Sequence, residues 1–274
     1  LVHLLPAGLL DIESRRALGA VFIPEERLGH ATVPDLRLSD NLILSRHGTD
    51  DLVHGGLIDI RRAHKLAHDV VLQFDVRSAQ RNPVARTLSG GNLQKFIMGR
   101  EILAQPGIMV VHQPTWGVDA GSAAAIHQAI IDLMARKVGE YADFMPGAKD
   151  LLKNLNLSGV PLALVSASPR VIVDAALKHV QPIPFATTIS ADDVKITKPD
   201  PEGYLKAAST LGVDISKCLI LEDSATGVAA ARASGAKVIA VPHLVKIESD
   251  HQTKVIHSLE ELNVDQLREY WLNW

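Results

Sequence analysis

The stretch at residues 88–94 combines residue types that bind anions. Ser89 is followed by Gly90 and Gly91, and a helical pattern begins directly after them. Glycines let backbone N–H groups come close to an anion, and a helix N-terminus adds partial positive charge. Ser89 adds a hydroxyl donor. The stretch therefore predicts a phosphate-binding turn, with a glycine turn that only caps a helix as the alternative.

A second candidate is the carboxylate pair Glu222 and Asp223, which follows a predicted buried strand. Ligand sites in open parallel sheets collect at the carboxyl ends of the strands. Two adjacent carboxylates repel each other unless a cation is near, and their hard oxygen atoms suit Mg²⁺. The pair predicts a magnesium site, and a turn that caps the next helix is the alternative.

Alternating strands and helices are predicted to position these residues. Apolar runs predict strands at residues 20–23, 108–111, 161–165, 186–189, 217–221 and 237–241. Apolar residues at helical spacing predict helices at 60–74, 92–103, 121–136, 147–155, 169–179, 201–211 and 224–233. The run at 108–111 is expected to be buried on both faces of a sheet. This alternation predicts an α/β fold with parallel sheets flanked by helices.

The composition is that of a globular protein, and its charge and aromatic content argue against some kinds of binding partner. The 274 residues include 28 basic and 31 acidic ones, which gives a net charge of −3. This balance, with only 4% aromatic residues, argues against a nucleic-acid partner. No apolar run approaches the ~20 residues of a membrane span. The single cysteine, Cys218, excludes an internal disulfide and predicts a reducing, cytoplasmic location.

Three segments in the first half carry a family resemblance. They are Leu88-Ser-Gly-Gly-Asn-Leu-Gln94, Phe22-Ile-Pro-Glu-Glu-Arg27 and Val110-Val-His-Gln-Pro-Thr-Trp-Gly-Val-Asp119. They resemble the signature loop, the Q-loop region and the catalytic strand with its D-loop in the second cassette of ABC importers for sugars or nucleosides. The resemblance covers residues 12–136 and implies a partial P-loop NTPase-type layer. It also implies residues that act on a nucleotide held by a partner cassette, namely Ser89, Gly90, Gly91, Gln94 and Asp119.

The catalytic positions of this resemblance are altered. Glu25 stands at the Q-loop glutamine, His112 at the magnesium-linked aspartate and Gln113 at the general base. Glutamine cannot accept a proton from water at neutral pH, so hydrolysis by such a site is impaired. No Gly-x-x-x-x-Gly-Lys-Ser/Thr string occurs to hold the β- and γ-phosphates. We therefore expect no ATP binding by this chain alone, and the resemblance implies another cassette or transporter subunit as partner.

Motifs after Tyr141 carry a second resemblance. They are Leu162-Ala-Leu-Val-Ser-Ala-Ser168, Lys198-Pro-Asp-Pro201 and Ile220-Leu-Glu-Asp-Ser-Ala-Thr-Gly-Val228. They resemble the second to fourth motifs of haloacid-dehalogenase-type hydrolases, close to the β-phosphoglucomutase-like phosphatases, which implies a Rossmann-like core. In this resemblance Ser166 and Lys198 bind the phosphoryl group of a small phosphorylated molecule, and Glu222 and Asp223 hold Mg²⁺.

The nucleophile of this second resemblance is missing. The family attacks phosphate with the first aspartate of Asp-x-Asp-Gly-Thr/Val, and no such string occurs in the sequence. The nearest string, around Asp11, lacks the Gly-Thr, and the family's helical cap is also absent. Each half lacks the first strand of its family too, which predicts exposed sheet edges and self-association.

We therefore predict a catalytically inactive fusion of two partial domains, at residues 1–137 and 138–274, that keeps some affinity for phosphate and Mg²⁺. One alternative is a Mg²⁺-dependent phosphatase acting on small sugar phosphates. The other is a nucleotide-binding module that completes the ATP site of a partner cassette.

Overall fold

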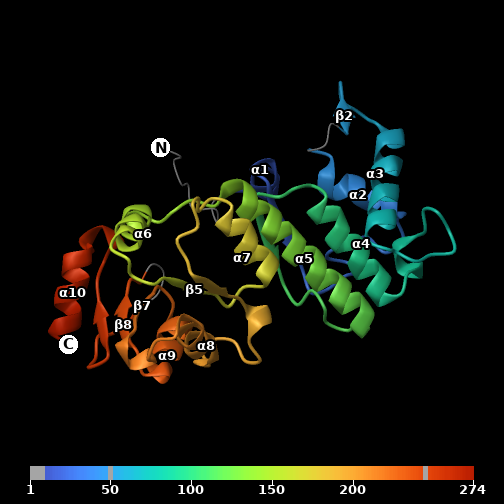
Figure 1. Ribbon diagram of the computed structural model, residues 1–274. Helices are drawn as coiled ribbons and strands as arrows, with labels where there is room; N and C mark the ends of the chain where they lie inside the picture. The colour runs from blue at the N-terminus through green and yellow to red at the C-terminus, as the bar shows by residue number, and fades with distance from the viewer. Residues whose placement is uncertain (1–9, 49–51, 243–245) are drawn as a thin grey trace. The chain divides into compact units, whose positions relative to one another are not determined.

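The computed structural model describes residues 10–48, 52–242 and 246–274 (Figure 1). The chain divides into two compact units, Leu1–Leu133 and Met134–Trp274. Helix α5 (Ala120–Tyr141) contains the boundary between them. The prediction that this helix ends at residue 136 is wrong, because no proline interrupts the following residues and the helix continues to Tyr141.

The first unit is built around one buried helix. Its elements are α1 (Ile12–Ala17), β1 (Ala20–Ile23), α2 (Leu38–Arg46), β2 (Val53–His54), β3 (Leu57–Ile58), α3 (Ile60–Gln73), α4 (Gly90–Ile102) and β4 (Ile108–Val111), with a 3-10 turn at Ala85–Thr87. β1 and β4 pair in parallel, and β2 and β3 form a short antiparallel ribbon. Every residue of α4 from Leu93 to Ile102 is buried.

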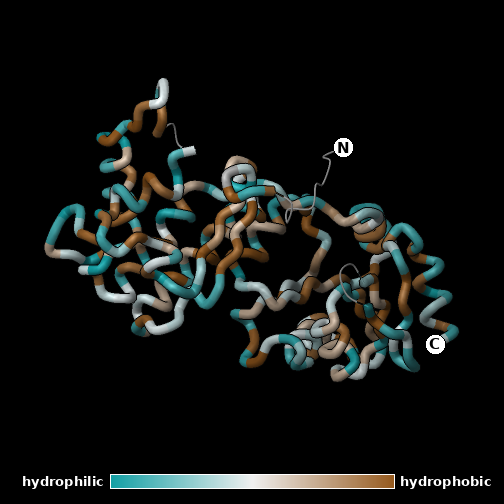
Figure 2. The backbone as a smooth tube through the Cα atoms, turned by 180° about the vertical axis from the view of Figure 1, so that it is seen from behind, coloured by the Kyte–Doolittle hydropathy of each residue, from teal (hydrophilic) through white to brown (hydrophobic). Residues whose placement is uncertain are grey.

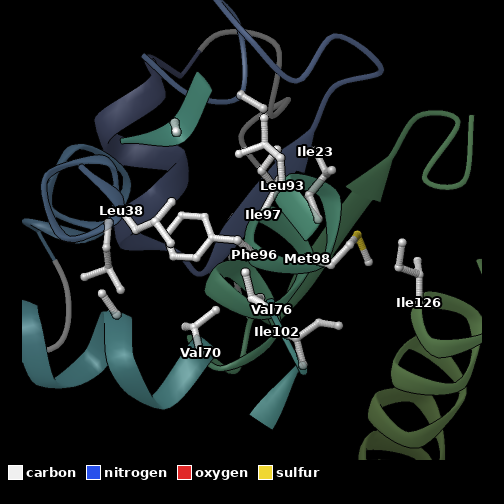
Figure 3. Packing of buried hydrophobic residues seen from close by; sticks show 14 of the residues in the cluster. Ile23, Leu38, Val70, Val76, Leu93, Phe96, Ile97, Met98, Ile102 and Ile126 are labelled. Carbon is white, nitrogen blue, oxygen red and sulfur yellow. The ribbon is translucent and has the colours of Figure 1, made fainter. Parts of the chain in front are cut away.

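Large apolar side chains fill the core around α4. Phe96 is fully buried and lies close to Leu38 of α2, while Met98 points toward Ile126 of α5 (Figure 3). Burying a side chain of this size contributes roughly 1.5–3 kcal/mol. The core therefore holds α2, α3 and α5 against α4 within this unit.

The two-stranded sheet β1–β4 meets the core on one face only. Met109 and Val111 pack against the core, but Ile108 and Val110 are 63% and 53% exposed. Phe22, whose partner across the ladder is Val110, is 55% exposed. Side chains alternate across a strand, so the expectation that residues 108–111 are buried on both faces is wrong.

The second unit alternates strands and helices along the chain. Its elements are α6 (Ala148–Leu157), β5 (Ala163–Val165), α7 (Arg170–Leu177), β6 (Thr187–Ile189), α8 (Glu202–Leu211), β7 (Leu219–Glu222), α9 (Ala225–Ser234), β8 (Lys237–Ala240), β9 (Thr253–Val255) and α10 (Val264–Leu272). Further 3-10 turns lie at Ala191–Asp193, Ile215–Lys217 and Leu259–Glu261. The predicted helices and strands of this half are present, and only β9 was not expected as a strand.

Parallel pairing joins the strands of the second unit. β5 pairs with β6, and β7, β8 and β9 form a three-stranded parallel sheet. Its middle strand is buried at Val238, Ile239 and Ala240. Helix α10, beside the C-terminus, carries both apolar and polar residues (Figure 2). The predicted α/β class with parallel strands and flanking helices is confirmed, and no described helix is long and apolar enough to cross a membrane.

Candidate functional site

Lys198 connects the carboxyl ends of β5 and β7. Its Nζ donates to the carbonyl oxygen of Val165, the last residue of β5, at 3.0 Å. The same ammonium forms an ion pair with the carboxylate of Glu222, the last residue of β7. Only 13% of the Lys198 side chain is exposed. A buried ammonium at the strand ends, where parallel sheets place their ligands, provides positive charge for a phosphoryl group.

Glu222 is a buried carboxylate held from several sides. Besides the ammonium of Lys198, the Tyr204 hydroxyl donates to it, and the Ser224 Oγ lies 3.2 Å from its Oε2. A Cβ at Gly227 would overlap this carboxylate. The two residues predicted to hold a metal therefore lie in different surroundings, because Glu222 is turned inward to Lys198 while Asp223 is exposed.

Tyr204 is a site residue that the sequence analysis missed. Burial and the negative charge of Glu222 raise the pKa of the Tyr204 phenol. The hydroxyl therefore stays protonated and donates to Glu222, and the ring centroid lies 4.9 Å from the Lys198 Nζ. The sequence did contain a signal for this residue, because Tyr204 lies on the apolar face of the helix predicted at 201–211. A buried phenol needs a hydrogen-bond partner, so a polar residue was to be expected beside it.

Ser166 and Lys198 line one small cavity of about 10 Å³ together with Tyr204. A cavity of this size has room for about one water molecule. The Ser166 Oγ accepts from the backbone N–H of Ser168 at 3.1 Å, which orients the hydroxyl beside the end of β5. The structure thus brings the two predicted phosphoryl-binding residues together.

One wall of this cavity is braced by Asp193. Its carboxylate accepts from the backbone N–H of Ser190 at 2.7 Å and from the Ser190 hydroxyl at 2.6 Å, and it pairs with Arg170. The hydrogen bonds from Ser190, followed by the one from Arg170, lower the pKa of Asp193 to about 2. Arg170 also donates to Thr188 on β6 at 2.8 Å. Asp193 thus fixes Ser190, which lines the cavity.

The signature-like residues of the first unit cap two helices. Ser89 caps α4, with its Oγ 2.9 Å from the Asn92 Nδ2. Asp119 accepts from the backbone N–H of Ser122 at 2.9 Å and from its hydroxyl at 2.7 Å, and these bonds lower the pKa of Asp119. A Cβ at Gly91 would lie 2.6 Å from the Ser122 Oγ. Gly91 therefore allows the two helix starts to pack closely.

Other predicted nucleotide-site residues lie in different surroundings. Gly90 is exposed, and a Cβ there would lie 2.9 Å from Arg27 Nη1. Gln94 is 2% exposed, and neither polar atom of its side chain has a hydrogen-bond partner among the described residues. Gln94 thus faces the core of its own unit.

The three altered catalytic positions lie on the surface near the end of β4. The Nδ1 of His112 lies 3.7 Å from the Glu25 carboxylate, and both side chains are solvent-exposed. Gln113 has a positive φ of 50°, a backbone conformation that is uncommon for residues other than glycine. The structure brings Glu25 and His112 together and places no described phosphate loop beside them.

We next ask whether side chains that could bind a metal ion lie close together. Among the residues that the structure describes, no group of three or more His, Cys, Asp or Glu side chains lies close enough to hold a metal ion. Mg²⁺ usually keeps several waters and takes one or two carboxylates together with substrate phosphates. The exposed carboxylate of Asp223, next to the Lys198–Glu222 pair, fits that donor set as a single ligand.

A family model described as haloacid dehalogenase-like hydrolase matches residues 46–235. The chain belongs to the haloacid dehalogenase-like hydrolase family. A solved hydrolase of this family from Entamoeba histolytica has a TM-score of 0.50 and 19% identity, over 76% of this chain and 93% of that one. At this identity the likeness shows the fold alone. The predicted resemblance of the second half to haloacid-dehalogenase-type hydrolases is thus confirmed.

Curated relatives of this haloacid dehalogenase-like hydrolase come from two classes of protein. A ribose import ATP-binding protein, RbsA 2 of Streptomyces coelicolor, is 34% identical over 49% of this chain and 26% of its own length. A bifunctional riboflavin kinase/FMN phosphatase of Arabidopsis thaliana is 36% identical over 44% of this chain and 33% of its own length. The chain therefore spans about a quarter to a third of these relatives.

Proposed function

We propose that the second unit binds the phosphoryl group of small phosphate monoesters at the place where haloacid-dehalogenase-type phosphatases hold it. The observation that carries this proposal is the buried Lys198 ammonium, which shares a cavity with Ser166 at the carboxyl end of β5. The FMN phosphatase part of the plant relative's name supports the same class of substrate. Lys198 and Ser166 would bind the phosphoryl oxygens.

Each residue around Lys198 has a distinct part in this proposal. Glu222 and Tyr204 hold the ammonium in place, and the hydroxyl of Ser166 donates a second hydrogen bond to the substrate. Asp223 would hold Mg²⁺, which when bound neutralises charge on the phosphoryl group. Because the pair with Lys198 occupies Glu222, we propose Asp223 alone as the carboxylate ligand.

Turnover is the decisive measurement, because the covalent route of the family needs an aspartate nucleophile and no Asp-x-Asp-Gly-Thr/Val string occurs in the sequence. The full chain should be assayed with p-nitrophenyl phosphate and Mg²⁺, and calorimetry should measure phosphate binding. Turnover that is lost in Asp223→Ala and Lys198→Ala supports a phosphatase. Phosphate binding without turnover supports the predicted inactive, phosphate-binding protein.

A matched control separates the site from general charge. Lys195→Ala removes an exposed lysine three positions before Lys198 and should leave phosphate affinity unchanged. Lys198→Ala should weaken phosphate binding by at least about tenfold, since one charge-assisted hydrogen bond contributes roughly 1.5–3 kcal/mol. Equal affinities in the two variants would exclude Lys198 from the site.

We also propose that the first unit descends from an import ATP-binding protein, fused to the hydrolase part near residues 137/138. This is supported by the ribose import relative and by the motifs at residues 88–94 and 110–119. In such a role Ser89 and Gly90 would contact the nucleotide of a partner cassette. A cassette that binds ATP itself should gain ATPase activity on addition of this chain, and Ser89→Ala should reduce that gain.

A further inference from the structure

A basic pocket in the first unit lies between α3, the start of α2 and the loop that precedes α4. It has a volume of about 560 Å³, which falls within the usual range for small-molecule sites. Its lining residues are Leu38, Ile60, Arg61, His64, Lys65, Ala67, His68, Val71, Arg81 and Asn82. None of them belongs to the sites described above.

The charge of this pocket has one sign. On α3, Arg61 and Lys65 are four residues apart, as are His64 and His68, and the two pairs are offset by three residues, so all four lie on neighbouring parts of one helix face. Arg81 joins them from the facing loop, and no carboxylate lines the pocket. Among the described residues, Arg61, Lys65 and Arg81 make no ion pair. A chain with more acidic than basic residues thus concentrates unpaired cations here, which favours a bound anion.

Hydrogen bonds hold the walls of the pocket in place. The side chain of Asn82 donates to the Ser39 Oγ at 2.8 Å and accepts from the Ser39 backbone N–H at 3.1 Å. The backbone N–H of Leu38 donates to the carbonyl oxygen of Pro83 at 3.1 Å. These contacts fix the loop that carries Arg81 to the start of α2. The pocket is therefore formed before any ligand arrives.

The inner surface calls for a ligand with an apolar part. Ile60 lines the pocket and is 53% exposed, and the partly buried Val71 lines it as well. His68 also lines the pocket, although its Nδ1 is itself buried and has no hydrogen-bond partner in the described part of the chain. The imidazole ring of His68 would therefore lie beside a bound ligand, without a hydrogen bond from its Nδ1.

We propose that this pocket binds a small organic anion that carries an apolar group. Arg61, Lys65 and Arg81 contact the anionic group at the mouth. Ile60 and Val71 contact the apolar body, and the imidazole ring of His68 lies beside it. This binding site is independent of the phosphoryl site around Lys198.

Naphthalene-2-sulfonate is a suitable probe, because it combines both features and is not a phosphatase substrate. Calorimetry with the full chain should show one site, and inorganic sulfate and 2-naphthol should each bind at least about tenfold more weakly. The combined variant Arg61→Gln, Lys65→Gln and Arg81→Gln should weaken sulfonate binding at least tenfold. The matched control Lys149→Gln, Lys153→Gln and Lys178→Gln removes the same charge from exposed positions of the second unit and should bind as the wild type does.

A measurement on the wild-type chain tests the proposal even if a variant fails to fold. Saturation with naphthalene-2-sulfonate should shift the imidazole NMR signal of His68 in the wild-type chain, while the exposed His127 stays unchanged. The proposal is overturned if the wild type does not bind the sulfonate, or if the His68 signal does not respond. Equal affinities in the two triple variants, or equal affinity for sulfate alone, would overturn it as well. Lys198→Ala should leave sulfonate binding intact, which separates this result from that of the phosphatase proposal.

Discussion

The carboxylate of Glu222 lies in a buried position, where Lys198, Tyr204 and Ser224 surround it. An ion pair of this kind adds little net stability as a unit, but removing one partner leaves the other charge buried and unpaired. The ion pair therefore holds the Lys198 ammonium in place, and the protein is destabilised when either partner is removed.

Glu222→Gln should lower the free energy of unfolding by about 3–5 kcal/mol, because Lys198 loses its counter-charge. Urea denaturation followed by circular dichroism measures this change. The exposed Glu140 provides a control, and Glu140→Gln should stay within about 0.5 kcal/mol of the wild type. Equal stability of the two variants would show that the Lys198–Glu222 pair is absent in solution.

Gln94 presents the opposite situation, a buried amide without partners among the described residues. Gln94→Met keeps the shape and removes the unsatisfied polar atoms, so it should raise the free energy of unfolding by about 1–3 kcal/mol. Gln73→Met on the exposed end of α3 should have little effect. A loss of stability in Gln94→Met would reveal a hydrogen-bond partner for the amide.

At the scale of elements, the close approach of α9 to β7 depends on Gly227. A methyl group there would overlap the Glu222 carboxylate, so Gly227→Ala should destabilise the chain by about 1–3 kcal/mol. Gly139 lies inside α5, where the nearest atom to an added Cβ is Ala175 Cβ at 3.8 Å. Gly139→Ala should therefore stabilise the helix by up to about 1 kcal/mol. Thermal denaturation should show a lower melting temperature for Gly227→Ala and a higher one for Gly139→Ala.

The bracing of β6 by Asp193 predicts a dependence of stability on pH. The pKa of Asp193 is lowered from 3.8 to about 2, so its contribution is complete above pH 3.8 and is lost as pH falls through 2. Urea midpoints measured between pH 5 and pH 2 should fall in the wild type. Asp193→Asn should be less stable at pH 5 and should show a shallower fall. Parallel curves for the two proteins would contradict this role.

At the scale of the whole molecule, each unit has its own hydrophobic core. The core around Phe96 serves the first unit, and separate clusters around Val238 and Ile239 serve the second. The first unit nevertheless leaves an apolar sheet face in solvent, at Phe22, Ile108 and Val110. Adjacent exposed apolar side chains on a sheet favour association between molecules.

Phe22→Thr combined with Val110→Thr should therefore reduce self-association, as measured by sedimentation velocity over a range of protein concentrations. Leu157→Thr removes an isolated apolar side chain that is 75% exposed and should change association little. An unchanged sedimentation profile in the double variant would show that this sheet face does not mediate association.

Much of the fold could be predicted from local pattern. Apolar runs predicted β1, β4 and the strands of the second unit up to β8. Such short continuous runs differ from the spacing of three and four residues that indicates a helix. The end of α5 and the strand β9 were missed, since short or weakly apolar segments carry little periodic signal. The pairing of Ser166 and Lys198 in one cavity followed the rule that strand ends collect ligand residues.

The sequence by itself determined the α/β class, the order of the motifs and the residue types available for phosphate chemistry. These properties depend on neighbours along the chain and on composition. Only the tertiary structure decided that Glu222 pairs with Lys198 and Tyr204 while Asp223 remains exposed. Lys198 and Glu222 are 24 positions apart, so their contact depends on how α8 and α9 pack on the strands. Adjacent carboxylates look alike in a sequence, but Glu222 is the last residue of β7 and is buried, whereas Asp223 follows the strand and is exposed.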